Sequence, residues 1–404
     1  MDSNDDAHAV TTAVPSSPLP PPQQLKIYHV ILDLDGTLID TETLVEEALE
    51  LIVTGYGKKW NGEGAHKRLG KRPLESAASL IQDYDLPCTP QELYSQILAF
   101  MKNRWAQARA LPGANRLVTH LHSHGVPFAI ASSSPAKNIK AKLSYQAGWT
   151  EAFTVVVAGD EVINGKPAPD IFLEAAKRLN ADPATCLVIE DAPAGVKAGK
   201  AAGMTVLAVP SLPTKEFHSL YSDADVVLNS LLDLEPETWG LPPFEDRIGG
   251  VLPMGPLYMG GPVVMGFGRG SKLLGIPTAN LATTALSKQL AENVCGVYIG
   301  WAGLANHGVY KMVMNIGWSP YFNNAEKTVE PWLLHDFAEN FYGVELRLVV
   351  VGYIRPEANF VSLEALVERI HEDGRIAKAA LDMAPYSQYA EDPYLTTMLP
   401  NSAT

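Results

Sequence analysis

Short, uniformly apolar runs alternate with amphipathic stretches over the first 235 residues of the chain. Such runs are typical of strands buried in a parallel sheet. Stretches with helical spacing, such as residues 170–179 and 192–202, lie between them. Strands that alternate with helices predict a doubly wound α/β domain with a parallel sheet. The predicted strands span residues 25–32, 127–131, 154–158, 186–189, 204–209 and 224–228.

A helical block interrupts this alternation between residues 41 and 110, where no strand is predicted. It follows directly after the first strand and its acidic turn, so we expect an inserted helical cap over a site at that turn. Phe100, Trp105 and Tyr56 are suited to stack on a planar ligand, but aromatic residues in helices also fill cores. The pattern leaves both roles open, and the cap alone names no substrate.

The pattern changes at residues 236–247, which carry three prolines and a glycine and few periodic apolar positions. This composition predicts a linker. Beyond it, short alternating strands are separated by glycine-rich turns, which is typical of a small β-barrel. The predicted strands include residues 261–267, 296–301 and 346–353, and the predicted helices span 363–371 and 376–381.

Two domains are therefore expected, an α/β domain over residues 25–235 and a barrel domain over residues 248–390. Residues 1–24 are rich in proline near their end and begin with an acidic stretch, which predicts a disordered tail. Residues 391–404 are expected to form a second tail.

Composition and charge narrow the class of protein. The net charge of −14 disfavours nucleic acid as a partner, because phosphate backbones attract basic surfaces. The three cysteines form no CxxC pair, so neither a disulfide framework nor a zinc site is expected. No run approaches the roughly 18 apolar residues of a membrane span, and the acidic amino terminus resembles no targeting segment. We expect a cytoplasmic protein that acts on small molecules, with no protein partner implied.

Two aspartates directly follow the first predicted strand. Asp33 and Asp35 stand two residues apart in the string Asp-Leu-Asp-Gly-Thr. Both side chains can face the crevice beyond the strand's carboxyl end, where open α/β sheets bind ligands. Hydrolysis of a phosphate ester needs an anionic nucleophile and an acid for the leaving oxygen. The pattern predicts Asp33 as the nucleophile and Asp35 as the acid and base.

Further partners for this chemistry occur in order along the chain. Ser132 follows a predicted strand and offers a hydrogen bond to a phosphoryl oxygen, and Lys166 supplies a cation. Glu190 and Asp191 follow another strand and are the hard oxygen ligands that Mg²⁺ prefers. These two carboxylates can also stabilise a helix N-terminus, and the two roles are compatible.

These residues closely resemble the motifs of the haloacid dehalogenase superfamily of phosphatases, over residues 25–235. The resemblance implies an aspartyl-phosphate mechanism with Mg²⁺ held by Asp33, the Asp35 main-chain carbonyl and Asp191, and with Glu190 assisting. A regulatory domain that senses a flavin without turnover is a non-enzyme alternative. The intact Asp33 and Asp35 argue against it.

A glycine-rich segment in the second half suggests a second phosphate site. Gly266, Gly268 and Gly270 let backbone N–H groups approach a phosphate closely, and Arg269 and Lys272 add positive charge. The spacing is neither a P-loop nor a Rossmann fingerprint. By itself the segment also suits an ordinary hairpin.

Thr278 and Asn280 follow at alternate positions after Pro277, where they are either ligands or simply the end of a strand. Taken whole, residues 266–280 closely resemble the signature of riboflavin kinases, and the resemblance continues over residues 248–385. It implies that Thr278 and Asn280 help bind Mg²⁺ and the ATP phosphates. The nucleotide contacts implied for the glycine-rich segment are Gly266, Gly268, Arg269 and Lys272.

The same resemblance implies that Glu330 is the base that activates the terminal ribityl hydroxyl. It also implies that Arg355 lies in the flavin-binding region, with His335 and Tyr342 nearer the nucleotide. One departure is visible, because many family members follow the glutamate with Thr-His and this chain has Pro331-Trp332. The carboxylate is kept, so the expected base remains, whereas a contact through that histidine is in doubt.

The two halves together resemble a bifunctional plant family that joins an FMN hydrolase to a riboflavin kinase. This resemblance implies FMN, riboflavin and ATP as small-molecule substrates and Mg²⁺ at both sites. We expect two independent sites, because each domain carries its own set of groups. A competing interpretation keeps the kinase and gives the phosphatase another ester, such as a sugar phosphate.

Overall fold

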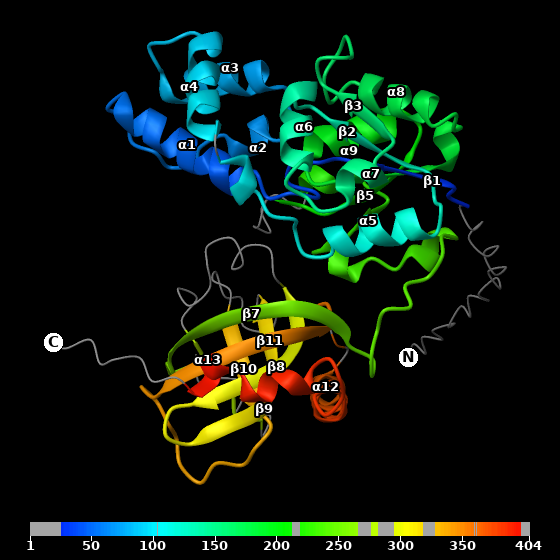
Figure 1. Ribbon diagram of the computed structural model, residues 1–404. Helices are drawn as coiled ribbons and strands as arrows, with labels where there is room; N and C mark the ends of the chain where they lie inside the picture. Colours follow the sequence, from blue (N-terminus) through cyan, green and yellow to red (C-terminus); the bar gives the residue numbers. More distant parts are fainter. Residues whose placement is uncertain are drawn as a thin grey trace, which may run out of the picture.

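The structure is a computed structural model that describes residues 26–102, 104–211, 219–265, 276–281, 295–317, 328–358, 360 and 362–396. An α/β unit with a helical insertion comes first, and a β-barrel with helices follows (Figure 1). The fold class predicted from the sequence is confirmed. No helix in the described part of the chain is long and apolar enough to cross a membrane.

The first unit is built on a six-stranded parallel sheet with strand order β3-β2-β1-β4-β5-β6. Crossovers in both directions from β1 make it doubly wound, as predicted. The first strand is shorter than expected, since residues 26–28 lie outside it. The strands are β1 (His29–Leu32), β2 (Phe128–Ser132), β3 (Val155–Ala158), β4 (Cys186–Glu190), β5 (Thr205–Ala208) and β6 (Val226–Val227).

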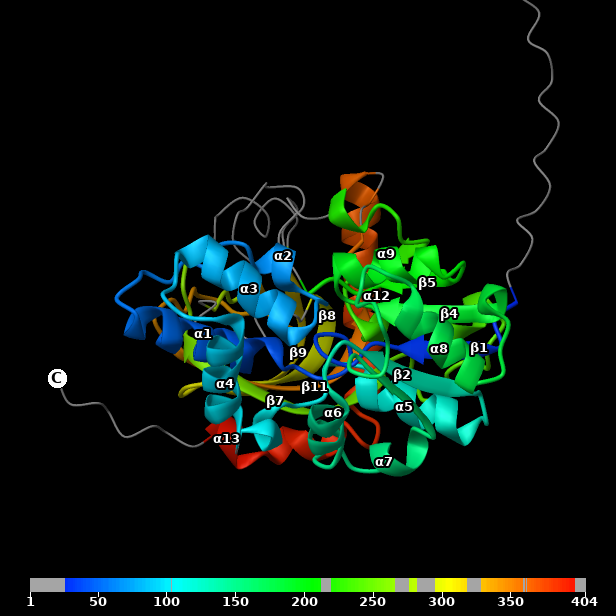
Figure 2. The ribbon, with the colours of Figure 1, turned by 90° about the horizontal axis from the view of Figure 1, so that it is seen from above.

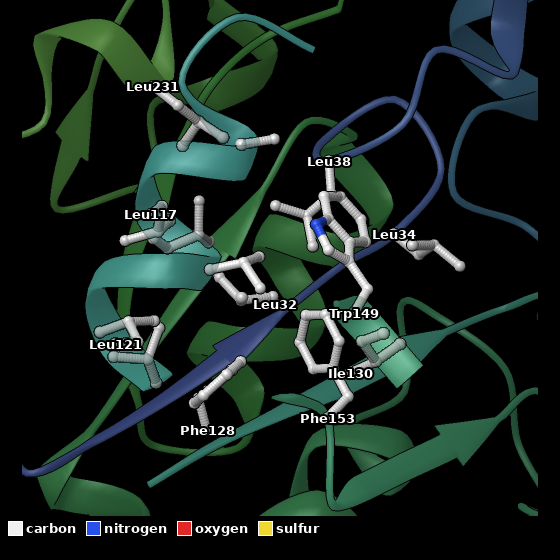
Figure 3. Close-up of a cluster of buried hydrophobic side chains, with 14 of the residues drawn as sticks. Leu32, Leu34, Leu38, Leu117, Leu121, Phe128, Ile130, Trp149, Phe153 and Leu231 are labelled. Atoms are coloured by element: carbon white, nitrogen blue, oxygen red, sulfur yellow. The ribbon is translucent and has the colours of Figure 1, made fainter. Parts of the chain in front are cut away.

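Successive side chains of each strand point to opposite faces of this sheet. Helices cover both faces. Leu32 belongs to the hydrophobic cluster on the side of α5 (Ala114–Ser123) and α7 (Trp149–Ala152), which Figure 3 shows. Ile31 belongs to the opposite cluster, on the side of α8 (Asp170–Arg178) and α9 (Pro193–Ala201). The sheet is therefore buried on both faces, which explains its uniformly apolar strands. Another helix, α6 (Ala136–Leu143), follows β2 and packs on the same side as α5 and α7.

Four helices form the insertion, α1 (Glu42–Gly55), α2 (Ala65–Arg68), α3 (Pro73–Tyr84) and α4 (Pro90–Met101). They have a hydrophobic cluster of their own and stand to one side of the parallel sheet (Figures 1 and 2). Two antiparallel segments, residues 38–41 and 109–111, connect them to the sheet unit, and we call these segments the hinge. Across it Asp40 N–H donates to Arg109 O and Leu111 N–H donates to Leu38 O, each at 2.9 Å.

The second unit is an antiparallel sheet with strand order β10-β9-β8-β11-β7. Its two edges are joined through residues 276–281, because Val264 bridges Asn280 and Leu281 bridges Val329. These bridges close the sheet into the predicted barrel. Its strands are β7 (Leu252–Pro262), β8 (Gly296–Leu304), β9 (Gly308–Gly317), β10 (Thr328–Leu333) and β11 (Glu345–Arg355).

One long helix, α12 (Leu363–Ala380), packs on the barrel where two helices were expected. The prediction of a break was wrong, and Gly374 shows why. A Cβ at this position would lie 2.8 Å from the Trp332 ring, so the glycine allows close packing within a continuous helix. A short helix, α13 (Pro393–Thr396), follows.

The segment predicted as a linker is packed rather than free. Trp239 and Leu241 are buried in the cluster of the α/β unit, and Ile27 N–H donates to Trp239 O at 3.1 Å. Just before this segment, the adjacent residues Leu231 and Leu232 belong to the clusters of different units. The two units therefore share a buried junction.

Candidate active sites

The carboxyl ends of β1, β2 and β4 bring the predicted phosphatase residues together. Leu32 pairs with Ile130 on one side and with Ile189 on the other. The residues that follow these strands therefore converge at one edge of the sheet. Asp33, Ser132, Lys166, Glu190 and Asp191 are all buried there.

Lys166 lies at the centre of this group. Its Nζ donates to Asp33 Oδ1 and to Glu190 Oε1, each at 2.6 Å, and to Ala131 O at 3.1 Å. Burial disfavours the charged amine, but the two carboxylates outweigh burial and raise the pKa of Lys166. The ammonium therefore keeps its charge beside Asp33, where a phosphate anion would have to approach.

Glu190 has both carboxylate oxygens engaged. Oε1 accepts from Lys166, and Oε2 accepts from Ala192 N–H at 2.7 Å. This arrangement suits Glu190 to orient Lys166, and its assisting role in metal binding stays a prediction.

A divalent cation fits the carboxylates of this site. Asp33, Glu190 and Asp191 each offer an oxygen within 4.8 Å of the others. Asp191 Oδ1 accepts from Thr37 Oγ1 at 3.1 Å, whereas Asp191 Oδ2 is buried without a hydrogen-bond partner among the described residues. Burial raises the pKa of Asp33 to about 8, against the opposing effect of Lys166, and raises that of Asp191 well above its usual value. Crowded, buried carboxylates with an unsatisfied oxygen are the donor set that Mg²⁺ prefers.

Asp35 is held by four donors. Its Oδ1 accepts from Thr41 Oγ1 at 2.8 Å and from Lys142 Nζ, and its Oδ2 accepts from Ser132 Oγ at 3.1 Å and Ser134 Oγ at 2.8 Å. Burial opposes ionisation, but the Lys142 ammonium and these hydrogen bonds hold the pKa of Asp35 below its usual value. Ser132 thus contacts Asp35 here.

Lys142, Thr41 and Ser134 were not among the predicted site residues. Lys142 is buried on α6, and its Nζ lies 4.9 Å from the centre of the Trp105 ring. Trp105 therefore stands close to the site, whereas Phe100 packs on the sheet cluster and Tyr56 on the cap cluster. No pattern along the sequence places a lysine on that helix against Asp35.

The cap contacts the loops of the site directly. Ser133 Oγ donates to Gly70 O at 2.7 Å. Arg72, also on the cap, donates to Val162 O at 2.6 Å and Ile163 O at 2.9 Å, in the loop that leads to Lys166. These bonds hold the cap against the sheet unit beside Asp33.

In the barrel, backbone pairing places predicted kinase residues side by side. Ala279 N–H donates to Pro331 O at 2.8 Å, and Leu281 N–H donates to Val329 O at 3.1 Å. Asn280 therefore stands opposite Glu330 in the ladder, and directly opposite residues project to the same face. Thr278, two residues earlier, shares that face. The structure thus groups Thr278, Asn280 and Glu330.

Arg355 lies at the end of β11 and is committed to α12. Its guanidinium forms a fork with the buried Asp373, with Nη2 at 2.7 Å and Nε at 3.1 Å from Oδ2. Trp332 is one of the two residues that depart from the family pattern. Its ring packs edge-on against His371 of α12, with 6.0 Å between ring centres. These contacts fix α12 against the face that carries Glu330.

The other residues predicted to contact the nucleotide lie outside the group of Thr278, Asn280 and Glu330. His335 packs between Tyr310 and Phe337 beyond the end of β10, with 4.8 Å between ring centres in each pair. Tyr342 is exposed, and the next residue, Gly343, donates to Val263 O at 2.8 Å, close to the bridge at Asn280. The predicted contacts Gly266, Gly268, Arg269 and Lys272 lie outside the described residues.

Comparison with known proteins assigns each half to a family. The model of the haloacid dehalogenase-like hydrolase family matches residues 27–203, and that of the riboflavin kinase family, Flavokinase, matches residues 254–381. A probable pseudouridine-5'-phosphatase of Drosophila melanogaster is 40% identical over 226 residues, which are 55% of this chain and 97% of the relative. A riboflavin kinase of Mus musculus is 45% identical over 137 residues, which are 34% of this chain and 88% of the relative.

Another relative spans both halves. A bifunctional riboflavin kinase/FMN phosphatase of Arabidopsis thaliana is 58% identical over 367 residues, which cover 91% of this chain and 96% of the relative. Its alignment runs through the sheet unit, the cap, the packed linker and the barrel, so the shared feature is the whole two-site arrangement. The chain therefore belongs to the family of bifunctional riboflavin kinase/FMN phosphatases.

Proposed function

We propose that the α/β site hydrolyses FMN to riboflavin and phosphate, and that the barrel site transfers phosphate from ATP to riboflavin. The observation that carries the first activity is the buried Asp33–Lys166–Glu190 chain, in which the carboxyl group of the proposed nucleophile lies 2.6 Å from the Lys166 ammonium. The grouping of Asn280 and Thr278 with Glu330 supports the second.

At the first site, Asp33 attacks phosphorus and forms an aspartyl phosphate while the bond to the ribityl oxygen breaks. Lys166 stabilises the negative charge that gathers on the phosphoryl oxygens. Asp35, once protonated, gives its proton to the leaving oxygen and then takes a proton from the water that cleaves the aspartyl phosphate. The four donors around Asp35 hold it in position, and at least one has to release it during turnover.

Both enzyme families generally use Mg²⁺, and riboflavin kinases use ATP. Asp33, Asp191 and the Asp35 carbonyl would hold the ion at the first site, and Thr278 and Asn280 would hold it at the second. The ion supplies positive charge that lets an anionic phosphate approach an anionic nucleophile. Asp191 Oδ2, which lacks a partner among the described residues, is the oxygen best placed for it.

At the second site, Glu330 accepts the proton of the ribityl hydroxyl as that oxygen attacks the terminal phosphate of ATP, and the bond from that phosphate to the leaving ADP breaks. Its position opposite Asn280 brings the base next to the residues that would carry the metal and the phosphates. Arg355, which pairs with Asp373 of α12, remains proposed as a residue of the flavin-binding region. His335 and Tyr342 remain proposed as nucleotide contacts.

A second candidate keeps the kinase and gives the phosphatase another substrate. The α/β half is also 36% identical to a protein named (DL)-glycerol-3-phosphatase 2 of Arabidopsis thaliana, over 227 residues. Residues that bind phosphate do not distinguish these esters, because the leaving group lies on the side of the cap.

The test measures phosphate release by the full chain in which Glu330→Ala removes the kinase base. FMN, glycerol 3-phosphate and sugar phosphates are compared with Mg²⁺ present and ATP absent. We expect the kcat/KM for FMN to exceed that of the other esters by about tenfold or more, since Trp105, which stands close to the site, would contact the flavin ring and has no such ring to contact in the smaller esters. Asp33→Asn in the same background should lower release by at least about a thousandfold. A clear preference for another ester would replace FMN as the substrate and leave the kinase assignment intact.

A further inference from the structure

A cavity of about 810 Å³ lies between the two units, and none of the site residues named above is among its lining residues. Its lining comes from the hinge, from α5, from residues 244–246 of the packed linker and from the first part of β7. Figure 1 shows β7 on the side of the barrel that faces α5. Ligand sites occur preferentially at such domain boundaries, and this volume falls within their usual range.

The wall formed by α5 and the hinge carries two guanidinium groups. Arg116 is paired with Asp246 through two bonds of 2.7 Å, yet its Nη1 is buried without a partner among the described residues. Arg109 is exposed, and no described residue forms an ion pair with it. Asp40 and Glu245 also line the cavity, but Asp40 already accepts two hydrogen bonds from Thr43. Glu245 is an exposed carboxylate with which no described residue forms an ion pair, whereas Arg109 and Arg116 Nη1 are the donors on this wall that suit an oxyanion.

Apolar and aromatic side chains form part of the remaining wall. Phe244 stacks beneath the Arg116 guanidinium at 3.5 Å from ring centre to Cζ, and its other neighbour is His120, at 4.4 Å between ring centres. Across the cavity β7 presents Met254 and Leu257. An apolar slot beside two arginines matches a planar aromatic ligand that carries a phosphate.

We propose that this cavity is a regulatory site for a planar heteroaromatic phosphate, the class of molecule that both active sites handle. The proposal rests on the proposed function, because FMN and the adenine nucleotides of the kinase reaction are the members of this class that the chain would meet. The cavity also reaches the cap. Arg109 and Asp40 belong to the hinge, where the Asp40 main-chain N–H donates to the Arg109 main-chain O at 2.9 Å. A ligand held by the Arg109 guanidinium would therefore act on the segment that connects the cap, and the expected result is a changed phosphatase rate.

The first experiment counts bound ligands by equilibrium dialysis of the full chain carrying Asp33→Asn, which blocks turnover of FMN. Two cavity variants are added separately, Arg109→Gln, which removes a guanidinium, and Met254→Trp, which fills the slot. We expect each to bind one FMN fewer per chain, while riboflavin, which lacks the phosphate, shows no loss in Arg109→Gln. The matched control is Arg375→Gln, an exposed arginine on α12 paired with Glu372, which should bind as many FMN molecules as its parent.

A parallel series with ADP separates the two sources of the phosphate ligand. If ADP and not FMN loses one equivalent in both cavity variants, the ligand is an adenine nucleotide. Unchanged counts for FMN and ADP in both variants would overturn the proposal. Kinase activity of each variant shows that the chain is folded, so that a lost equivalent reports on the cavity.

A second readout tests the link to the hinge. In the Glu330→Ala chain, ADP should change the rate of p-nitrophenyl phosphate hydrolysis by about twofold or more, and Arg109→Gln should abolish this response. A response that survives in both cavity variants would contradict the regulatory site. Failure of the wild-type chain to release phosphate from FMN would refute the proposed phosphatase function and leave the binding count unaffected, so the two failures are distinguishable.

Discussion

Gly195 offers a sharp test of the architecture around Lys166. It lies inside α9, where a glycine is normally a weak point that alanine would improve. A Cβ at this position would instead meet the Glu190 carboxylate, with Oε2 at 2.5 Å and Cδ and Oε1 closer still. Cβ atoms do not approach other atoms so closely, so Gly195→Ala has to displace the Glu190 carboxylate.

The size of the effect on stability follows from the hydrogen bonds that Glu190 accepts. The displacement breaks the bonds from Lys166 and from Ala192 N–H, and hydrogen bonds to charged groups contribute about 1.5–3 kcal/mol each. The gain from replacing a helical glycine with alanine is about 1 kcal/mol. We therefore expect Gly195→Ala to lower the free energy of unfolding of the α/β unit by about 2–5 kcal/mol. Lys166 loses one of its two carboxylate partners, so phosphatase kcat should fall by about a hundredfold.

Urea denaturation measures the first effect and phosphate release from FMN the second. Gly55→Ala is the matched control, because Gly55 ends α1 and has no atom within 4 Å of its would-be Cβ. It should leave activity unchanged and alter stability by no more than about 1 kcal/mol. Kinase activity serves as an internal control, since the barrel site shares no residue with this region. Wild-type stability and turnover in Gly195→Ala would refute the assignment of Glu190 as the support of Lys166.

Three further changes test other contacts. Lys166→Met should abolish phosphate release, by at least about a thousandfold, while riboflavin phosphorylation continues; both rates are measured on one preparation. Arg72→Met removes two hydrogen bonds that hold the cap and should lower the phosphatase kcat/KM by about tenfold, whereas Arg72→Lys should recover part of it. Burial, partly offset by the hydrogen bond from Tyr353, raises the pKa of Asp233 to about 6. Between about pH 4 and 6, Asp233 is therefore protonated in the folded chain and ionised in the unfolded chain. The stability that comes from this bound proton is lost as the pH rises through 6. Asp233→Asn should remove this pH dependence and raise the free energy of unfolding by up to about 3 kcal/mol at pH 7, but by little at pH 4. Urea denaturation at the two pH values measures the difference.

The sequence predicts the acidic groups of the phosphatase site because they follow strand ends. Asp33 comes directly after an apolar run, and Asp191 comes one residue beyond another. Because parallel strands end at one edge of a sheet, both carboxylates are expected at the same place. The glycine that directly follows Asp35, Gly36, also has a structural reason. It has φ +87°, and a Cβ there would lie 2.8 Å from Asp191 Cγ, so the turn needs a glycine for both its backbone and its space.

Residues that arrive from other elements could not be predicted in this way. Lys142 reaches Asp35 from 107 residues away, and Arg72 reaches Ile163 across 91 residues. Both stand in stretches whose local pattern is that of an ordinary exposed helix or loop. The break predicted in α12 failed for a related reason, because Gly374 is set by tertiary packing on Trp332 and not by helix propensity.

The junction between the units bears on how one chain runs opposed reactions. Leu231 packs into the α/β cluster and Leu232 into the barrel cluster, while Asp233 accepts a hydrogen bond from Tyr353 of β11. Gly113, which follows the hinge, lies against the backbone of Leu231 and Leu232, because a Cβ there would be 2.7 Å from it. The barrel is thus anchored at the point where the cap connection enters α5, although the two active sites share no residue. Independent chemistry and a common mechanical junction are compatible, and the cavity beside that junction is where a ligand would touch both units at once.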